Sequence, residues 1–322
     1  MKKSLLGAAL AACVAAAPVA PSVADVKMSV GVGIDPSMAV LYVAEKAGIF
    51  KKNGLDVSLK LGPSGSAMFP LVLSEQLQAA VGSEYAAIQV HNLDSNVVVV
   101  AEVTRMPVWA GIIGRGVSTL EGLKGKRIGV QKGSGSELTW LAIVKSKKLN
   151  PKDYKVVAVD PPEMVAALER RDIDAFVAFE PWMTRATLNV SGAKWIVDNK
   201  GILDPRNFAV MNKKWIEKNK AASEAFVRAL AEAGDYLVAN PAKSAEIVSA
   251  RIRLELPLTT ALLKKLKYDV RLVSDTVHHF KETEQQIKSG GRLKKNVVWK
   301  ELIFPDLLRA VRPDRVKGLN LQ

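Results

Sequence analysis

The chain has almost no cysteine and almost no histidine. Its 322 residues include one cysteine, Cys13, and three histidines. Because Cys13 lies in an N-terminal apolar stretch, the rest of the chain has no disulfide bond, no thiolate nucleophile and no cysteine ligand for zinc or iron–sulfur clusters. Three histidines are also too few to favour a histidine-rich metal site. We therefore expect neither a metal nor a cofactor.

Long linkers and internal repeats are missing after Pro21. Hydrophobic residues make up 48% of the chain and charged residues 24%, which is a globular composition and excludes intrinsic disorder and collagen-like structure. The length is enough for two domains of ordinary size rather than one small module.

The N-terminus has the pattern of an export signal. Lys2 and Lys3 precede an apolar run over residues 5–17, and small residues lead up to Ala24. We predict a signal peptide cleaved after Ala24, with the mature protein in the periplasm, because the run is too short to cross a bilayer. The four residues ending in Cys13 also resemble a lipobox, but the apolar segment before them is unusually short. We therefore favour the cleaved form over the lipoprotein.

The net charge of +14 raises the question of nucleic-acid binding. Lysine and arginine are spread along the chain, however, and no basic run is longer than two residues. No zinc-finger, RNP-type or basic-zipper pattern is present. We expect no nucleic-acid partner and favour a protein that works in the periplasm or on an anionic surface.

Strand-like and helix-like segments alternate, which is typical of α/β proteins. Strands are predicted at residues 26–33, 55–61, 79–82, 97–103, 109–113, 127–130, 156–159, 175–179 and 208–211. Helices are predicted from Pro36 to Gly48 and at residues 68–78, 137–148, 162–171 and 223–238, followed by a helical cap at 258–266, 275–288 and 299–309. Ser134 and Glu137 form a capping-box pattern, which predicts a helix start.

Three segments resemble periplasmic solute-binding proteins of nitrate-, sulfonate- and taurine-type ABC importers. Residues 42–57 (YVAEKAGIFKKNGLDV) are similar to that family's opening motif, and residues 123–134 (LKGKRIGVQKGS) to its entry into a second lobe. Residues 167–182, with Asp172 to Ala175 and Glu180-Pro181-Trp182, resemble a third motif. Each motif alone is weak, but they occur in the matching order from about Val26 to Val248.

The resemblance implies a two-lobe type II periplasmic-binding fold with a two-strand hinge. Lobe one would be discontinuous, with residues 25–108 and 206–322, and lobe two would hold residues 109–205. We expect the crossovers near residues 106–111 and 201–208. The sequence departs from the family pattern at Gly82-Ser83-Glu84 and at Arg171, which replaces a common glycine, and these departures put the ligand rather than the fold in doubt.

Ligands of open α/β sheets bind beyond the carboxyl ends of the strands. Hydroxyl-bearing loops at helix N-termini suit an anionic group, and the carboxylates suit an ammonium or N–H group. Aromatic walls favour an organic ligand. The predicted ligand-binding residues are Asp35, Ser37, Met38, Tyr42, Ser64, Gly65, Ser66, Ser83, Glu84, Arg105, Trp109, Ser134, Gly135, Ser136, Glu180 and Trp182.

The leading hypothesis is a monomeric solute-binding component that closes on an aliphatic sulfonate or taurine-like ligand and delivers it to ABC permease subunits. A nitrogenous ligand such as a pyrimidine, or nitrate, is the alternative for the same fold. A sensing module for a receptor is an alternative of another class. An enzyme is not favoured, because His91, His278 and His279 are expected to be surface or helix-face residues away from the glycine-rich loops.

Overall fold

The computed structural model describes residues 25–293 and 295–322. The predicted leader, its cleavage site after Ala24 and the lipobox at Cys13 lie outside the described residues. Within those residues, no helix is long and apolar enough to span a lipid bilayer.

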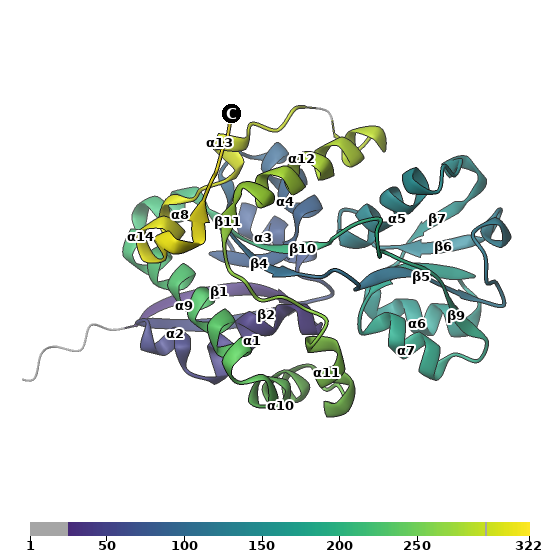
Figure 1. The fold of residues 1–322 in the computed structure, drawn as a ribbon, viewed down its shortest axis with the longest axis horizontal. Helices are drawn as coiled ribbons and strands as arrows, with labels where there is room; N and C mark the ends of the chain where they lie inside the picture. The colour runs from purple at the N-terminus through teal and green to yellow at the C-terminus, as the bar shows by residue number, and fades with distance from the viewer. Residues whose placement is uncertain (1–24, 294) are drawn as a thin grey trace, which may run out of the picture.

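Two five-stranded mixed sheets form the framework, so the predicted α/β class is confirmed (Figure 1). The first sheet has the order β2-β1-β3-β10-β4, with strands β1 Val26–Gly33, β2 Leu55–Gly62, β3 Ala79–Ser83, β4 Val97–Arg105 and β10 Arg206–Asn212. The second has the order β7-β6-β8-β5-β9, with strands β5 Ala110–Arg115, β6 Arg127–Val130, β7 Lys155–Ala158, β8 Ala175–Phe179 and β9 Ala193–Asp198. In the first sheet β1 is parallel to β2 and β3, and β10 runs antiparallel to β3 and β4.

Helices cover both sheets. Those of the first half of the chain are α1 Ala39–Lys46, α2 Ile49–Lys52, α3 Phe69–Leu73, α4 Glu84–Leu93, α5 Gly135–Ser146, α6 Pro161–Arg170 and α7 Trp182–Asn189. The later ones are α8 Lys213–Lys218, α9 Lys220–Ala239, α10 Pro241–Ile252, α11 Leu256–Leu263, α12 Ser274–Ser289, α13 Trp299–Leu302 and α14 Asp306–Val311. Short 3-10 turns at Pro36–Met38, Ser66–Met68, Glu121–Leu123, Pro151–Asp153 and Pro313–Arg315, and a two-stranded ribbon of β11 Leu272–Val273 and β12 Val316–Lys317, complete the fold.

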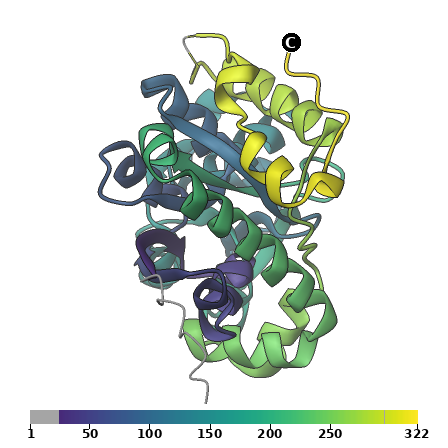
Figure 2. The ribbon, with the colours of Figure 1, turned by 90° about the vertical axis from the view of Figure 1, so that its left-hand side faces the viewer.

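The C-terminal segments lie along β4 and close that edge of the first sheet. Isolated bridges join Val99 to Ile303, Glu102 to Arg271 and Arg105 to Lys267. Figure 2 shows the yellow C-terminal helices gathered over this end of the molecule. Because β4 is covered in this way, all its residues before Arg105 are buried, which explains its continuous apolar sequence.

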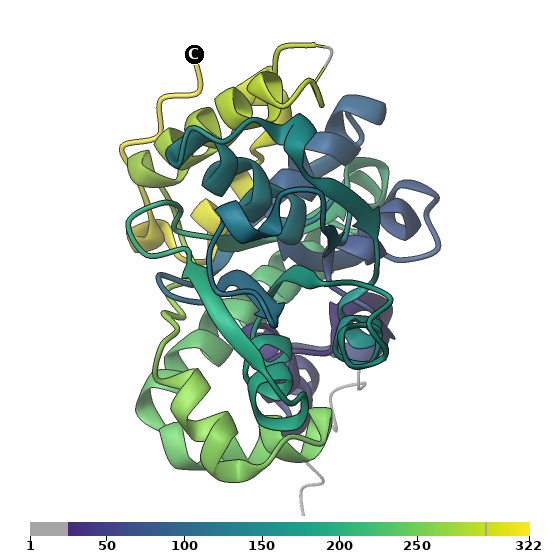
Figure 3. The same cartoon turned by 90° about the vertical axis from the view of Figure 1, so that its right-hand side faces the viewer.

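The second sheet is packed on both faces. Met164, Leu168 and Phe176 belong to the cluster under α6 and α7. Ile128, Trp140 and Ile143 belong to the cluster under α5. Figure 3 shows this part of the molecule from its own side, with helices on either side of the strands.

The chain passes between the two sheets twice, through residues 106–109 and 199–205. Asn199 joins the two segments. Its Oδ1 accepts hydrogen bonds from the backbone N–H groups of Trp109 and Ala110, both at 2.8 Å, and its Nδ2 donates to the carbonyls of Pro107 at 3.0 Å and Leu203 at 2.8 Å. One buried side chain thus ties both crossovers together.

One predicted helix is too long, and helices α4 and α7 and strand β9 were not predicted. The helix predicted over residues 68–78 ends at Leu73, because Glu75 has a left-handed backbone with φ of 59°. Helix α4 was not predicted, because its apolar residues are buried around most of its circumference and leave no amphipathic pattern. Arg171, where the sequence departs from the family pattern described above, ends α6 with φ of 63°.

Candidate functional site

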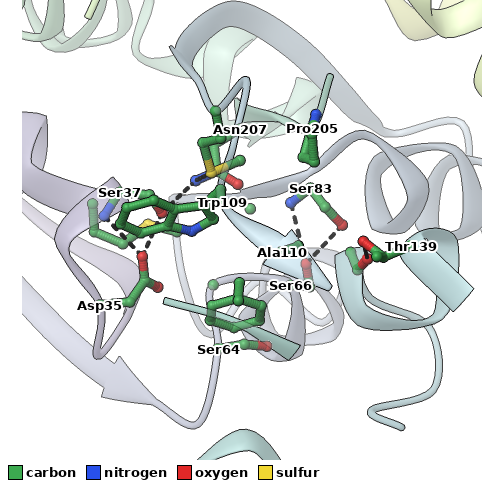
Figure 4. A pocket seen from close by; sticks show the side chains of 16 residues that line it. Asp35, Ser37, Ser64, Ser66, Ser83, Trp109, Ala110, Thr139, Pro205 and Asn207 are labelled. Carbon is green, nitrogen blue, oxygen red and sulfur yellow. Dashed lines mark hydrogen bonds between the residues drawn. The ribbon is translucent and has the colours of Figure 1, made fainter. Parts of the chain in front are cut away.

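A cavity lies between the two sheets, beside the two crossovers (Figure 4). Its volume is about 40 Å³, or about 430 Å³ when the open space out to its mouth is included. The first sheet's loops supply Asp35, Ser37, Met38, Ser64, Gly65 and Ser66, with Gly82 and Ser83 from β3 and Asn207 from β10. The crossovers and the second sheet supply Met106, Trp109, Ala110, Gly135, Thr139, Phe179 and Pro205. A ligand here would touch residues carried by both sheets.

Asp35 stands on one side of the cavity, directly after β1 (Figure 4). It caps the turn at Pro36–Met38 by accepting a hydrogen bond from the Ser37 N–H at 2.8 Å. The Ser37 hydroxyl also donates to the same oxygen, Oδ1, and Asn207 Nδ2 donates to the Ser37 hydroxyl at 2.8 Å. Burial raises the pKa of Asp35 from 3.8 to about 6, against the opposing effect of the Ser37 hydrogen bonds.

Serine hydroxyls form the opposite side of the cavity (Figure 4). Ser66 Oγ and Ser83 Oγ are 2.9 Å apart, and Ser66 Oγ accepts from the Ser83 backbone N–H at 3.1 Å. Thr139 adds a hydroxyl from α5, and Gly135 at the start of that helix comes close to Ser83. The Thr139 hydroxyl donates to the Gly135 carbonyl at 2.8 Å, and one of the two serine hydroxyls donates to the other. The remaining proton of that serine pair can be donated to an acidic ligand group, as can that of Ser64, whose Oγ accepts from the Ala67 N–H.

Apolar side chains form the remaining wall. Met38, Met106, Trp109, Phe179 and Pro205 line the cavity, and Trp109 is 2% exposed. Of the described residues that line the cavity, none is a lysine, arginine or histidine. The space therefore combines a carboxylate, a group of hydroxyls and an aromatic wall, which suits a small organic ligand.

The lining includes nine of the predicted ligand-binding residues: Asp35, Ser37, Met38, Ser64, Gly65, Ser66, Ser83, Trp109 and Gly135. Residues that the sequence analysis missed are Gly82, Met106, Ala110, Thr139, Phe179, Pro205 and Asn207. Phe179 ends a predicted strand, and Thr139 lies one turn into a predicted helix, so both positions could have been found. Asn207 comes from β10, whose place between β3 and β4 was not foreseen.

The predicted serines of the second glycine-rich loop face inward instead. Ser134 Oγ accepts from the Ser136 N–H at 3.1 Å and donates to the Gln131 carbonyl at 2.8 Å. Ser136 Oγ donates to the Val177 carbonyl and accepts from the Gln131 N–H. The predicted helix start is correct, but Glu137 accepts from the Gly133 N–H rather than from Ser134. Ser136 therefore ties the loop to β8, Ser134 bonds within the loop, and neither residue is part of the cavity lining.

Glu84 also lies outside the cavity lining. It begins α4 and is fully buried, with Oε1 2.9 Å from Nε2 of His279 on α12. The histidines were predicted to be surface or helix-face residues. His91 on α4 and His279 on α12 lie on helices but are buried, whereas His278 is exposed.

The other predicted residues have structural partners. Glu180 accepts hydrogen bonds from the Thr184 N–H and hydroxyl and lies 3.8 Å from Lys265 Nζ. Trp182 is buried in the core of the second sheet. Tyr42 donates to the Gly33 carbonyl beneath Asp35, and Arg105 pairs with Glu102 at 3.7 Å. Of these, Tyr42 lies next to the cavity wall, and none contributes to the lining.

The sequence profile of the NMT1/THI5-like family matches residues 35–244. The chain belongs to this family. A protein of Brucella abortus (strain 2308), named only as a binding protein, is 24% identical over 232 residues, covering 67% of this chain and 68% of that protein. The taurine-binding periplasmic protein of Escherichia coli (strain K12) is 27% identical over 186 residues, covering 52% of this chain and 57% of that protein.

A solved structure shares the fold of this NMT1/THI5-like protein. The alkanesulfonate-binding protein SsuA from Xanthomonas axonopodis pv. citri, bound to MOPS, superposes with a TM-score of 0.79. It is 16% identical, and the match covers 88% of this chain and all of that one. The resemblance to the periplasmic-binding fold is therefore confirmed.

In this NMT1/THI5-like protein, polar contacts on both flanks of the cavity join elements packed on the first sheet to elements of the second. On one flank, Glu137 of α5 accepts from the Tyr85 hydroxyl of α4 at 3.1 Å and pairs with Arg292 at 3.1 Å. On the other, Glu180 faces Lys265. All three contacts would have to break if the cavity opened widely.

Because Gly65 has no side chain, β3 can lie close to the loop after β2. A Cβ at Gly65 would lie 1.9 Å from the Val81 carbonyl oxygen. We expect Gly65→Ala to push the Ser64–Ser66 loop away from β3 and to lower the free energy of unfolding by about 1 to 3 kcal/mol. Urea unfolding followed by circular dichroism would measure the change.

Gly135→Ala is the matched control in the same cavity, because a Cβ there would meet Ser83 Cβ at an ordinary 3.4 Å. It should leave stability nearly unchanged. Equal stability of the two variants would show that the loop after β2 has room to move, contrary to the contact described.

Proposed function

We propose that this protein is the periplasmic solute-binding component of an ABC importer and that its ligand is a small organic molecule of the aliphatic sulfonate or taurine-like class. The single observation that carries the proposal is the cavity between the sheets, which is lined by residues of both. Membership of the NMT1/THI5-like family and the similarity to taurine- and alkanesulfonate-binding proteins support it.

The proposed mechanism is closure rather than catalysis. Residues 25–108 and 206–322 would form one lobe and residues 109–205 the other, and the lobes would rotate about the two crossovers. A ligand that contacts both lobes favours the closed state, because it binds that state more tightly than the open one. The closed, monomeric protein would then dock on the permease subunits and release its ligand.

Different residues of the cavity lining would bind the acidic end and the carbon chain of such a ligand. Ser64 and one hydroxyl of the Ser66–Ser83 pair would donate hydrogen bonds to a sulfonate group, as neutral donors can do in a site that excludes water. Trp109 and Phe179 would cover the carbon chain. Asp35, the one charged side chain among the described residues of the lining, would then determine which ligand of this class binds.

A thermal-shift screen tests the proposal. Residues 25–322 would be unfolded, washed and refolded to remove any bound ligand, and then screened against taurine, alkanesulfonates, nitrate, amino acids and pyrimidines. A ligand at a hundredfold excess over its dissociation constant stabilises the folded state by about 2.7 kcal/mol, so a selective rise in melting temperature is expected with a sulfonate.

The other outcomes are equally informative. A selective rise with nitrate or with a pyrimidine would keep the solute-binding role and overturn the sulfonate assignment. No rise with any compound would contradict the proposed function. A rise that persists in Gly65→Ala without loss of affinity would move the ligand out of this cavity.

A further inference from the structure

The carboxylate of Asp35 is buried in the cavity wall with half of its hydrogen-bonding capacity unused. The residue is 2% exposed. Oδ1 accepts both hydrogen bonds from Ser37, whereas no described residue donates a hydrogen bond to Oδ2. Because Asp35 lines the cavity, Oδ2 is available to whatever occupies that space.

No positive charge compensates Asp35 among the described residues. The phenols of Tyr42 and Tyr268 lie near it, and burial, reinforced by the charge of Asp35, raises the pKa of both, so both are neutral at pH 7. The arginines and lysine in the neighbourhood have other carboxylate partners: Arg251 pairs with Glu45, Arg105 with Glu102 and Lys265 with Glu180.

A buried carboxylate without a cationic partner is unfavourable, and a positively charged group placed against it removes that penalty. We infer that the ligand carries a protonated amino group, which binds Asp35 Oδ2, and that Asp35 selects amine-bearing ligands over otherwise identical molecules without the amine. This inference rests on the proposed function and names the ligand more closely.

The rest of the cavity fits the other end of such a molecule. Ser66 and Ser83 lie across the cavity from Asp35 (Figure 4), so an acidic group bound there and an amine at Asp35 would be joined by a short carbon chain beside Trp109. A simple alkanesulfonate or nitrate would bring a negative charge toward Asp35 with nothing to offset it. The site is therefore built for a zwitterion.

Calorimetric titration with matched ligand pairs tests the inference. The probes are taurine against ethanesulfonate and 2-aminoethylphosphonate against ethylphosphonate, at pH 7.5. Charge pairs buried in an interface lose about 2 to 5 kcal/mol when one partner is removed, so the amine member of a pair should bind at least about thirtyfold more tightly. Asp35→Asn should abolish that preference, because it weakens binding of the amine member and relieves the repulsion of the member without the amine.

Glu284→Gln is the matched control, because Glu284 is a buried carboxylate on α12 that bonds the Val297 N–H outside the cavity. It should keep the full preference for the amine. Equal binding of taurine and ethanesulfonate, or a preference that survives Asp35→Asn, would overturn the inference and leave the solute-binding function intact. Failure of all four probes and of nitrate to bind would overturn both.

Discussion

Replacing Glu102 by glutamine is expected to lower the free energy of unfolding by about 3 kcal/mol, because it removes the buried carboxylate that three arginines share. The loss lies at the low end for a broken buried pair, because Arg206 and Arg271 also pair with Asp275. Glu102 is fully buried on β4. Its oxygens accept from Arg206 Nη1 at 3.1 Å, Arg271 Nε at 3.1 Å and the Thr276 hydroxyl at 2.7 Å. Urea unfolding with linear extrapolation to zero denaturant would measure the loss.

Glu246→Gln provides the control for this prediction. Glu246 and Lys243 form an ion pair at 2.8 Å, but their side chains are 53% and 64% exposed. Exposed pairs contribute about 0 to 1 kcal/mol, so this variant should unfold almost as the parent does. If the two variants lost the same small amount, the charge of Glu102 would not hold the C-terminal segments on β4.

Asp35→Asn is expected to make the empty protein more stable at neutral pH. The native pKa of about 6 lies above the ordinary 3.8, so the folded state binds the proton more tightly than the unfolded state does. Stability is therefore lost as the pH rises from about 4 to 6, and the deficit at pH 7 is about 3 kcal/mol at 1.36 kcal/mol per pH unit. Asparagine keeps the acceptor for Ser37 and removes the charge.

The gain should therefore depend on pH. Unfolding free energies of ligand-free parent and variant would differ by about 3 kcal/mol at pH 7 and by less than about 1 kcal/mol at pH 4. Asp56→Asn, on the exposed face of β2, serves as the control and should show no such gain. A variant no more stable than the parent at pH 7 would mean that the buried carboxylate carries no desolvation penalty.

Most strands could be predicted because their signals are local, although β9 was missed. Residues 26–33, 127–130 and 175–179 are predicted with the bounds that the structure has. The helix start at Ser134 was also predictable, because capping depends on residues only a few positions apart. Helix α4 was missed because α3 and α12 cover faces that an isolated surface helix would leave polar, and that burial depends on tertiary contacts.

The site was predictable where it follows a strand end and unpredictable where it depends on side-chain direction. Asp35 and Ser64 to Ser66 come directly after β1 and β2, and the carboxyl ends of parallel strands meet at one edge. Glu84 and Glu180 also follow strands, but their carboxylates bond to His279 and Thr184. Nothing near Glu84 in the sequence reveals a partner 195 positions away.

Asn199 has a consequence for how this family member could vary. Its four hydrogen bonds link the two crossovers, so in the proposed closure both segments would move together. The loops that line the cavity follow other strands, such as β1 and β2. Substitutions in those loops would change which ligand binds without changing the Asn199 link between the crossovers. Ligand specificity and the proposed closure could therefore evolve separately.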